Sequence, residues 1–514
     1  MRRHAAQGGE WGSVSQPRAK VAIIGGGPGG YEAALVAAQL GADVTIVERD
    51  GPGGACVLSD CVPSKTLIAT SGLMAALDGS ARLGIRLGGA GYPGAVPAAV
   101  SAGSGTTRQP SGPAGAGPAA AGPGPAAPAG TGRAEVDALR LYARVRALAG
   151  AQSDDVAGRL AAEGIEVLPG TGRLAGPRTV AVGDREIAAD VVLIATGAQP
   201  RNLPDAVPDG DRVLTCRQLY GLGELPAELV VVGSGVTGAE FASAYQALGS
   251  QVTLVSSRGR VLPHEDADAA VVVEEVFRRR GMTVLGRSRA TAVRRTADGV
   301  AVILADGRTV HGSHCLLTVG MVPGTRGLGL EQAGIALDGR GFVPVDRVSR
   351  TSVPGVYAAG DCTGVMMLAS VAAMQGRIAM WHALGEAVQP IRLSHVAATI
   401  FTEPEIATVG ITQQAVETGQ ADALVVKLPL ATNARAKMQG FRDGFIKLFA
   451  RRSSGIVLGG VVVAPRASEL ILAVSLAVEQ LLTVDQMAHT FAVYPSLSGS
   501  LTEAARRLMQ PADT

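Results

Sequence analysis

The chain has 514 residues, of which 47% are hydrophobic and 3% aromatic, and its formal net charge is +2. This length exceeds one ordinary core and predicts about three domains, while the nearly balanced charge without a basic tract argues against nucleic-acid binding. No apolar run reaches the roughly 18 residues of a membrane span, and residues 1–19 lack the apolar segment of a signal peptide. We therefore predict a cytoplasmic protein with a disordered tail at residues 1–19.

The five cysteines do not form the pattern of a secreted disulfide framework. Cys56 and Cys61 are separated by four residues, which is not the spacing of a zinc knuckle, so we predict no metal site. In a cytoplasmic protein such a pair is more often catalytic than structural. Cys216, Cys315 and Cys362 are expected at buried apolar positions.

Residues 21–48 predict a β-α-β unit that binds a dinucleotide. Its strands and helix are expected at Val21–Ile24, Tyr31–Leu40 and Val44–Val47. Gly25, Gly27 and Gly30 would let the backbone approach a pyrophosphate at the helix N-terminus. Glu48 lies 18 residues after Gly30 and would accept hydrogen bonds from a ribose diol. The unit suits the ADP half of FAD, and the alternative is an ordinary tight turn between strand and helix.

The next helix is expected over residues 55–75 and carries Cys56 and Cys61 at its start. Two thiols across one loop can close a disulfide, and a helix N-terminus stabilises a thiolate. The alternative is a pair of buried free cysteines. Residues 88–132 are rich in Gly, Pro, Ala, Ser and Thr and predict a flexible insertion, after which a helix is expected at Ala134–Leu160.

A second glycine loop follows the predicted strand Leu229–Val232 and precedes another at Val252–Val255. Its glycines are Gly233, Gly235 and Gly238. The position equivalent to Glu48 is Ser256, and Arg258 and Arg260 come shortly after it. A serine and arginines tolerate a ribose 2′-phosphate that an acid would repel, so this loop suits NADPH or either nicotinamide cofactor. The alternative for the arginines is an ordinary solvated loop.

The remaining elements complete a mixed α/β chain. The buried strands Val191–Ala195 and Val356–Ala359 run into Thr196-Gly197 and Gly360-Asp361, respectively. From about Leu393 the pattern changes to mixed strands and helices, which predicts a separate C-terminal domain. Its elements are expected at Val425–Leu428, Phe445–Phe449, Val457–Val463 and Ala467–Gln480.

With these motifs, the chain resembles the class I flavoprotein disulfide reductases, the family of lipoamide dehydrogenase, glutathione reductase and mercuric reductase. The likeness rests on a G-G-x-C-x4-C-x-P-S-K pattern, an A-T-G turn, an A-G-D motif and the start of a dimerisation domain. The matching residues are Gly53, Gly54, Cys56, Cys61, Pro63, Ser64 and Lys65, then Ala195–Gly197, Ala359–Asp361 and Phe401–Gly410. It covers nearly the whole chain except the tail and the insertion.

The resemblance implies two Rossmann-like domains, for FAD and NAD(P)H, and a C-terminal α+β dimerisation domain in a homodimer. The FAD-binding domain would comprise residues 20–205, with the insertion at 88–132, and residues 326–392. Residues 206–325 would bind NAD(P)H, and residues 393–514 would form the dimerisation domain.

The resemblance also implies roles for individual residues. Cys61 would be the thiol against the isoalloxazine, and Cys56 would be the outer, interchange thiol. Lys65 would lie near flavin N5 and pair with Glu240, because a buried ammonium without a carboxylate is costly. Asp361 would bind the ribityl chain, and Gly54, Thr196 and Gly197 belong to the same FAD motifs.

The chain departs from the family pattern in its disulfide-exchange machinery. Disulfide reductases carry a C-terminal His-Pro motif with a glutamate five residues after the histidine, and these positions hold Tyr494 and Gly499 here. A phenol is a poor base at neutral pH, and His489 is five residues too early. Asp60 replaces the usual glycine beside Cys61, and its carboxylate is expected to raise the pKa of that thiol unless it faces solvent.

These departures resemble a lipoamide-dehydrogenase-like branch of NAD(P)H:quinone reductases, since a quinone needs no imidazole relay. We therefore expect an FAD-dependent enzyme that passes a hydride from NAD(P)H to FAD and on to a quinone, with Tyr494 of the partner subunit lining the acceptor pocket. A membrane quinone would be reached by peripheral contact. The alternatives are a dihydrolipoamide dehydrogenase with another base, and a non-catalytic flavoprotein subunit of a complex.

Overall fold

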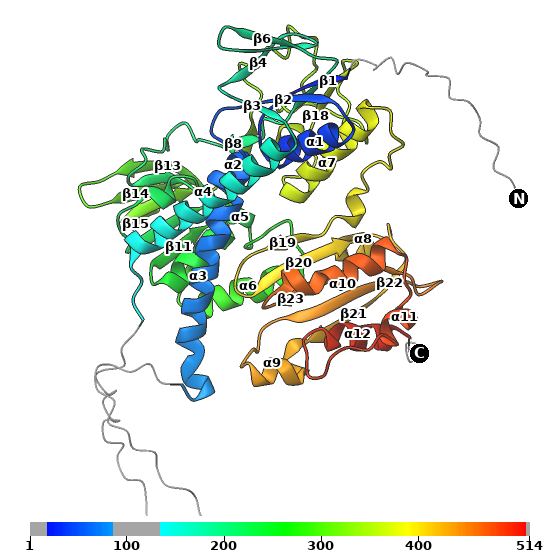
Figure 1. Cartoon of the computed structure of the whole chain (residues 1–514). Coiled ribbons are helices and arrows are strands. Elements are labelled where there is room, and N and C mark those ends of the chain that lie inside the picture. Colours follow the sequence, from blue (N-terminus) through cyan, green and yellow to red (C-terminus); the bar gives the residue numbers. More distant parts are fainter. Residues whose placement is uncertain (1–17, 86–133, 510–514) are drawn as a thin grey trace, which may run out of the picture.

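The computed structural model describes residues 18–85 and 134–509 (Figure 1). Most of the predicted tail and the whole predicted insertion at 88–132 lie outside the described residues. The chain forms a mixed α/β fold, as predicted, with two five-stranded parallel sheets, one five-stranded antiparallel sheet and smaller antiparallel sheets. No helix within the described ranges is long and apolar enough to cross a membrane.

The first parallel sheet has the strand order β18-β7-β1-β2-β3. Its strands are β1 (Lys20–Ile24), β2 (Asp43–Glu48), β3 (Glu166–Pro169), β7 (Val191–Ile194) and β18 (Val356–Ala358). The helices around it are α1 (Pro28–Gln39), α2 (Gly54–Leu58), α3 (Cys61–Gly79), α4 (Ala138–Ala162) and α7 (Ala369–Ala383). Because β18 pairs with β7 in parallel register, the chain returns to this sheet after the whole second nucleotide-binding unit.

The predicted helix over residues 55–75 is wrong in one respect, because the chain forms two helices there. α2 ends at Leu58, and α3 begins at Cys61. Between them Asp60 adopts φ −130° and ψ −95°, outside helical values. The break puts Cys56 inside one helix and Cys61 at the first position of the next.

The second parallel sheet has the order β12-β11-β10-β16-β9 and repeats the first unit. Its elements are β9 (Val213–Thr215), β10 (Glu228–Val232), α5 (Val236–Leu248), β11 (Gln251–Val255), α6 (Ala267–Arg279), β12 (Thr283–Leu285) and β16 (His314–Leu317). Small antiparallel sheets flank both units. The first consists of β4 (Gly172–Gly176), β5 (Thr179–Val182) and β6 (Arg185–Ala188). The second consists of β13 (Ala290–Arg295), β14 (Val300–Leu304) and β15 (Thr309–Gly312). The third pairs β8 (Ala198–Pro200) with β17 (Met321–Pro323).

The C-terminal part is an antiparallel sheet of order β19-β20-β23-β22-β21 with helices packed on it, in the lower part of Figure 1. Its strands are β19 (Ala398–Ile400), β20 (Glu405–Gly410), β21 (Ala423–Pro429), β22 (Phe445–Arg451) and β23 (Val457–Ala464). Its helices are α8 (Gln413–Glu417), α9 (Ala434–Met438), α10 (Ala467–Glu479), α11 (Val484–Ala488) and α12 (Gly499–Met509). The predicted strands and helix of this region are therefore confirmed to within a few residues.

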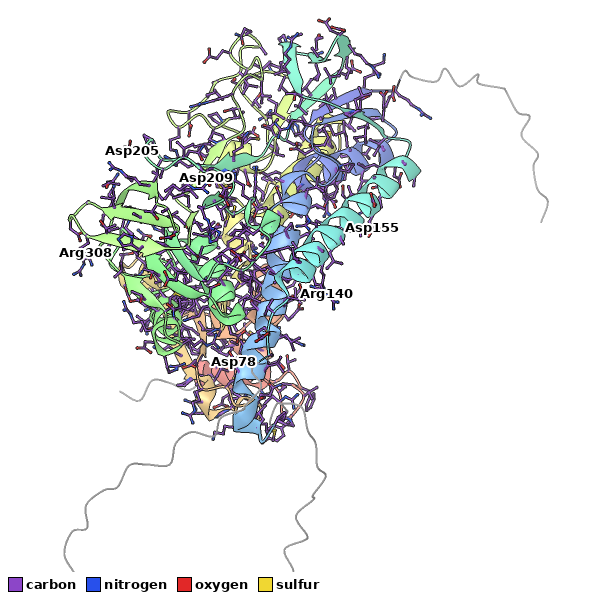
Figure 2. The ribbon with its side chains drawn as sticks, turned by 90° about the vertical axis from the view of Figure 1, so that its left-hand side faces the viewer. Asp78, Arg140, Asp155, Asp205, Asp209 and Arg308 are labelled. Atoms are coloured by element: carbon purple, nitrogen blue, oxygen red, sulfur yellow. The ribbon has the colours of Figure 1, made fainter. Side chains whose placement is uncertain are left out.

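The long helices α3 and α4 pack on each other and join the two halves of the molecule. α4 begins at Asp137, whose side chain accepts a hydrogen bond from the Arg140 amide. Figure 2 shows Arg140 and Asp155 on the outer side of α4, where both are exposed. The inner face of α4 buries Tyr142, whose hydroxyl lies 3.0 Å from that of Tyr245 on α5. This contact holds α4 against the second nucleotide-binding unit.

Candidate active site

One large cavity of about 1940 Å³ runs between the first parallel sheet, α5 and the start of the C-terminal sheet. It gathers most residues that the sequence predicted for binding and chemistry. Those that line it are Gly25, Gly27, Glu48, Gly54, Cys56, Cys61, Lys65, Thr196, Gly197, Glu240 and Asp361. The first turn of α5, with Val236 and Thr237, forms part of the same wall. The second glycine loop therefore reaches the cavity through these two residues, whereas Gly233, Gly235 and Gly238 do not line it.

The first glycine loop is shaped by close backbone contacts. Gly25 has φ +106°, and a Cβ there would lie 2.3 Å from the Ala195 carbonyl oxygen. Gly30 does not line the cavity, but a Cβ there would lie 1.9 Å from the Gly25 carbonyl oxygen. Side chains are therefore excluded at both positions, and the loop presents backbone at the N-terminus of α1. The Glu48 carboxylate accepts hydrogen bonds from the amides of Gly26 and Asp50, which holds it beside this loop.

Several polar groups on the cavity wall fit a dinucleotide such as FAD. The Thr196 hydroxyl and the Arg217 Nε are buried without a hydrogen-bond partner among the described residues. Buried polar groups are normally paired, so these atoms indicate a polar ligand. Burial and the nearby Asp60 carboxylate raise the pKa of Asp361 to about 6, and Arg217 opposes that rise. A ligand hydroxyl is a suitable partner for such a carboxylate.

Cys56 and Cys61 are free thiols in the structure, so the predicted disulfide is not formed in it. The two side chains are hydrogen-bonded to each other. That bond, together with burial, raises the pKa of Cys56, whereas the same bond lowers the pKa of Cys61. The Cys56 thiol is therefore the donor, and Cys61 is the more acidic of the two sulfurs.

Asp60 raises the pKa of Cys61, as predicted, but other groups near Cys61 determine the net shift of this pKa. The Cys56 hydrogen bond lowers the pKa of Cys61, while burial and Asp60 raise it and Lys65 lowers it further. The net shift is downward. The expected direction of the Asp60 effect is therefore confirmed, and the hydrogen bond that Cys56 donates to this sulfur outweighs it.

Lys65 and Glu240 form the predicted ion pair, with 2.8 Å between Nζ and Oε2. The Glu240 side chain is 5% exposed, and its other oxygen accepts a hydrogen bond of 2.9 Å from the Phe401 amide. The Lys65 ammonium lies 4.9 Å from the centre of the Phe401 ring. Burial is the largest single influence on Lys65 and lowers its pKa, but Glu240, Cys61 and Asp60 together raise the pKa of Lys65. A lasting positive charge thus stands beside Cys61.

The second glycine loop repeats the backbone contacts of the first. Gly233 has φ +115°, and a Cβ there would lie 2.3 Å from the Thr318 carbonyl oxygen. At Gly238 a Cβ would lie 1.9 Å from the Gly233 carbonyl oxygen. Gly235 is the residue preceding α5. The geometry is that of a phosphate-binding turn at a helix N-terminus.

The three residues predicted to favour NADPH have different surroundings. The Ser256 side chain is fully buried, and its hydroxyl lies 2.7 Å from that of Ser234. Arg260 donates to the carbonyl oxygens of Pro263 and Glu265. These contacts argue against a direct role for Ser256 and Arg260 in binding a 2′-phosphate. Arg258 is exposed, and its carbonyl oxygen accepts the amide of Arg287, which brings a second arginine to this loop.

Arg217 and Arg287 are functional candidates that sequence reasoning missed. Arg217 lines the cavity and donates to the Ala198 carbonyl oxygen at 2.8 Å. The guanidinium of Arg287 lies over Gly259, where an added Cβ would be 3.6 Å from Arg287 Nε. Neither residue belongs to a glycine or cysteine motif, so the sequence carries no local signal for them.

Tyr494 lies away from the cavity of its own chain. Its side chain is 85% exposed, and the neighbouring Phe491 and Val493 are also exposed. His489 is mostly exposed, and its ring contacts Asp485 in the preceding turn. No histidine is present among the described residues that line the cavity.

Comparisons with known proteins agree with this geometry. The family described as pyridine nucleotide-disulphide oxidoreductase matches residues 19–376, and its dimerisation domain matches residues 396–505. The chain is 51% identical over 504 residues to a protein of Mycobacterium tuberculosis named NAD(P)H dehydrogenase (quinone), covering 95% of this chain and 94% of that protein. It is 31% identical over 492 residues to a dihydrolipoyl dehydrogenase of Geobacillus stearothermophilus, covering 94% of each.

A solved structure has the same architecture. The crystal structure of LpdA from Mycobacterium tuberculosis superimposes with a TM-score of 0.83 at 50% sequence identity, covering 96% of this chain and all of that chain. The likeness spans the first parallel sheet, the second parallel sheet and the C-terminal antiparallel sheet.

Proposed function

Because the chain belongs to the pyridine nucleotide-disulphide oxidoreductase family, whose members use FAD and NAD(P)H, we propose that it is an FAD-dependent NAD(P)H:quinone oxidoreductase. It would pass a hydride from NAD(P)H through FAD to a quinone. The 51% identity to a protein named NAD(P)H dehydrogenase (quinone) supports this assignment. The observation that carries it is a complete Cys-Lys-Glu centre in a chain that has Tyr494 and Gly499 at the positions of the family's histidine and glutamate.

The cavity residues suit the cofactors as follows. FAD would be held by the backbone of Gly25, Gly27 and Gly54, by Glu48 and Asp361, and by Thr196 and Gly197, with Gly30 supporting the turn. When bound, FAD supplies a two-electron carrier. NAD(P)H would be held at Gly233, Gly235 and Gly238, with Arg258 near the ribose.

The Cys-Lys-Glu centre would control charge around the flavin. Lys65 keeps its proton because Glu240 is only 2.8 Å away, and a cation there favours added negative charge nearby. Lys65 helps to lower the pKa of Cys61, whereas the hydrogen bond to Cys61 and burial raise the pKa of Cys56. The chain can therefore store an electron pair as a dithiol without an imidazole.

We also propose a homodimer in which Tyr494 of one subunit lines the acceptor side of the other. The exposed apolar side chains Phe491 and Val493 beside it support a buried interface, and the matched dimerisation domain supports the same assembly. The domain division proposed is 20–205 with 326–392 for FAD, 206–325 for NAD(P)H and 393–514 for dimerisation.

A dihydrolipoamide dehydrogenase is the second candidate, favoured by the Cys56–Cys61 pair and by the 31% identity to a dihydrolipoyl dehydrogenase. The test is a side-by-side steady-state assay of the purified flavoprotein with NADPH and either a quinone or lipoamide. Fast quinone turnover with lipoamide turnover lower by about 10²-fold or more is expected, since general-base catalysis contributes on that scale. Comparable lipoamide turnover would establish the second candidate.

A further inference from the structure

Phe401 belongs to the C-terminal part of the chain but lies in the candidate active site. It directly follows β19 and lines the large cavity, as do Lys65 on α3 and Glu240 on α5. The three residues therefore reach one cavity from three distant segments of the chain. The sequence motif that contains Phe401 indicates only the start of the dimerisation domain and assigns this residue no part in the chemistry.

Phe401 contacts both members of the Lys65–Glu240 ion pair. The centre of its ring lies 4.9 Å from the Lys65 Nζ atom. Its backbone amide donates a hydrogen bond of 2.9 Å to Glu240 Oε1, while Glu240 Oε2 lies 2.8 Å from Lys65 Nζ. Each oxygen of the Glu240 carboxylate thus has a partner, and the ammonium has both a carboxylate and an aromatic ring beside it.

Hydrogen bonds tie the segment that begins at Phe401 to α5. Besides the bond from the Phe401 amide to Glu240, the Glu403 amide donates to the Ser243 hydroxyl at 3.2 Å. Glu240 and Ser243 both lie on α5 and are three residues apart, so they are neighbours on the surface of this helix. The backbone of Phe401 is therefore held against the helix that carries Glu240.

Buried apolar residues also fix the spacing of the three segments. Leu67 on α3, Phe241 on α5 and Ile400 at the end of β19 belong to one hydrophobic cluster and are 0%, 2% and 4% exposed. Close packing of this kind leaves the backbones little freedom. The Lys65 side chain is different, because it is 34% exposed and its charge lies at the end of a flexible four-carbon stem. A contact besides the ion pair is therefore needed to hold the ammonium in one place.

From these contacts, and resting on the proposed function, we infer that Phe401 is a positioning residue for the Lys65 ammonium. The electron-rich face of the ring attracts the cation, and the ring excludes water from that side of it. A cation held in one place stabilises negative charge that develops beside it. The C-terminal part of the chain therefore acts on the electrostatics of the active site in its own subunit, in addition to its proposed role in dimerisation.

The test compares Phe401→Leu and Phe401→Tyr in the FAD-loaded full chain. Leucine removes the ring but keeps an apolar side chain and the backbone amide that donates to Glu240. Anaerobic reduction of the flavin by NADPH is expected to slow about fivefold in Phe401→Leu, the scale of one cation–π contact at a partly exposed site. The midpoint potential of the flavin, measured by dye equilibration, should become more negative, because the ammonium is no longer held in one place. Tyrosine keeps the ring, so Phe401→Tyr should match wild type in both measurements.

The matched control is Phe445→Leu, which removes another ring that lies near lysine ammonium groups. The centre of this ring is 5.5 Å from Lys427 Nζ and 5.6 Å from Lys447 Nζ, and Phe445 does not line the cavity. The control should leave the flavin potential and the rate of flavin reduction unchanged. FAD content and melting temperature check folding in each variant.

A second series serves if Phe401→Leu loses FAD. Mono-, di- and trifluorinated phenylalanine are then placed at this position, because fluorine withdraws electron density from the face of the ring and largely keeps its shape. The rate of flavin reduction and the flavin potential should fall stepwise along the series. A series without any trend would overturn the role of the ring.

The remaining outcomes separate this inference from the proposed function. A wild-type potential and rate in Phe401→Leu, or an equal loss in Phe401→Tyr, would show that the ring does not hold the ammonium. If wild type reduces no quinone, the proposed function fails, and the flavin measurements still decide the role of Phe401.

Discussion

Glu240→Gln isolates the charge of the Lys65–Glu240 pair from its other contacts. Glutamine keeps an oxygen that can accept the Phe401 amide, now bonded at 2.9 Å, so the change removes the charge. Removing one partner of a buried pair typically costs about 3–5 kcal/mol. Because the Lys65 side chain is 34% exposed, water screens part of this loss, and we expect about 2 kcal/mol. That corresponds to a factor of about 30 in an equilibrium or rate constant.

Two measurements check this loss. Urea denaturation should show the free energy of unfolding reduced by about 2 kcal/mol. Stopped-flow reduction of the bound flavin by NADPH should slow by at least about tenfold, because the cation beside Cys61 is less firmly held. The pKa of Lys65 is raised in wild type, so its stabilising effect is complete at neutral pH and is lost as pH rises through that raised value. In Glu240→Gln the loss should begin at lower pH.

A double-mutant cycle decides whether the effect belongs to the pair. Lys65→Met, Glu240→Gln and the double variant should show a coupling free energy above about 1 kcal/mol. The control is Glu503→Gln, which breaks surface ion pairs with both Arg506 and Arg507 and should cost below about 1 kcal/mol. A coupling near zero at Lys65–Glu240 would refute the assignment of the loss to this ion pair.

Three further variants test the cofactor and thiol assignments. Arg258→Ala should raise the KM for NADPH by about tenfold and leave the KM for NADH unchanged. The control is Arg294→Ala, at another exposed arginine. Equal effects on both cofactors would show that Arg258 does not contact the 2′-phosphate. Arg217→Met should weaken FAD binding by about tenfold or more in apoprotein titrations, because the cofactor would lose its contact with the buried Arg217 Nε. An unchanged dissociation constant would show that this atom does not contact FAD. Asp60→Gly removes a carboxylate that raises the pKa of Cys61. The ultraviolet absorbance of the Cys61 thiolate should therefore appear at lower pH than in wild type. A shift to higher pH would contradict the stated effect of Asp60 on this pKa.

The nucleotide-binding units were predictable because short-range sterics determine them. Gly25 and Gly233 both have positive φ and contact a carbonyl oxygen from the neighbouring strand end, and that requirement is visible as glycine in the sequence. The strands around them are continuous apolar runs, as buried parallel strands are. The Lys65–Glu240 pair followed from the family pattern rather than from any local rule, because 175 residues separate its members.

The features that were mispredicted or missed depend on contacts between distant segments. Ser256 was expected to accept a ribose 2′-phosphate, which stays a prediction, and the sequence did not indicate that its hydroxyl would contact that of Ser234 in a buried position. The Cys61 pKa depends on a hydrogen bond from Cys56 whose geometry requires the helix break at Asp60. Tyr494 is exposed on a single chain, so its predicted role stays a prediction that needs the second subunit.

The buried Lys447 connects the C-terminal sheet to the second nucleotide-binding unit. Its ammonium lies 2.8 Å from Asp266 and 2.7 Å from Asp268, and the Lys447 and Asp266 side chains are 2% and 4% exposed. Asp266 also caps α6 by accepting the Ala269 amide. Lys447→Met therefore leaves a buried carboxylate without its cation and should lower the free energy of unfolding by about 3 kcal/mol.

The matched control is Lys427→Met, because Lys427 pairs with Asp268 at 3.0 Å but is 46% exposed, so its loss should cost below about 1 kcal/mol. Adding Asp266→Asn to Lys447→Met should recover part of the stability, since asparagine retains the cap and removes the unpaired charge. Urea denaturation of the four proteins measures these differences. If Lys447→Met were as stable as Lys427→Met, apolar packing alone would hold β22 against α6. If it is less stable and the double variant recovers, a buried charge fixes how the C-terminal sheet sits against the NAD(P)H-binding unit.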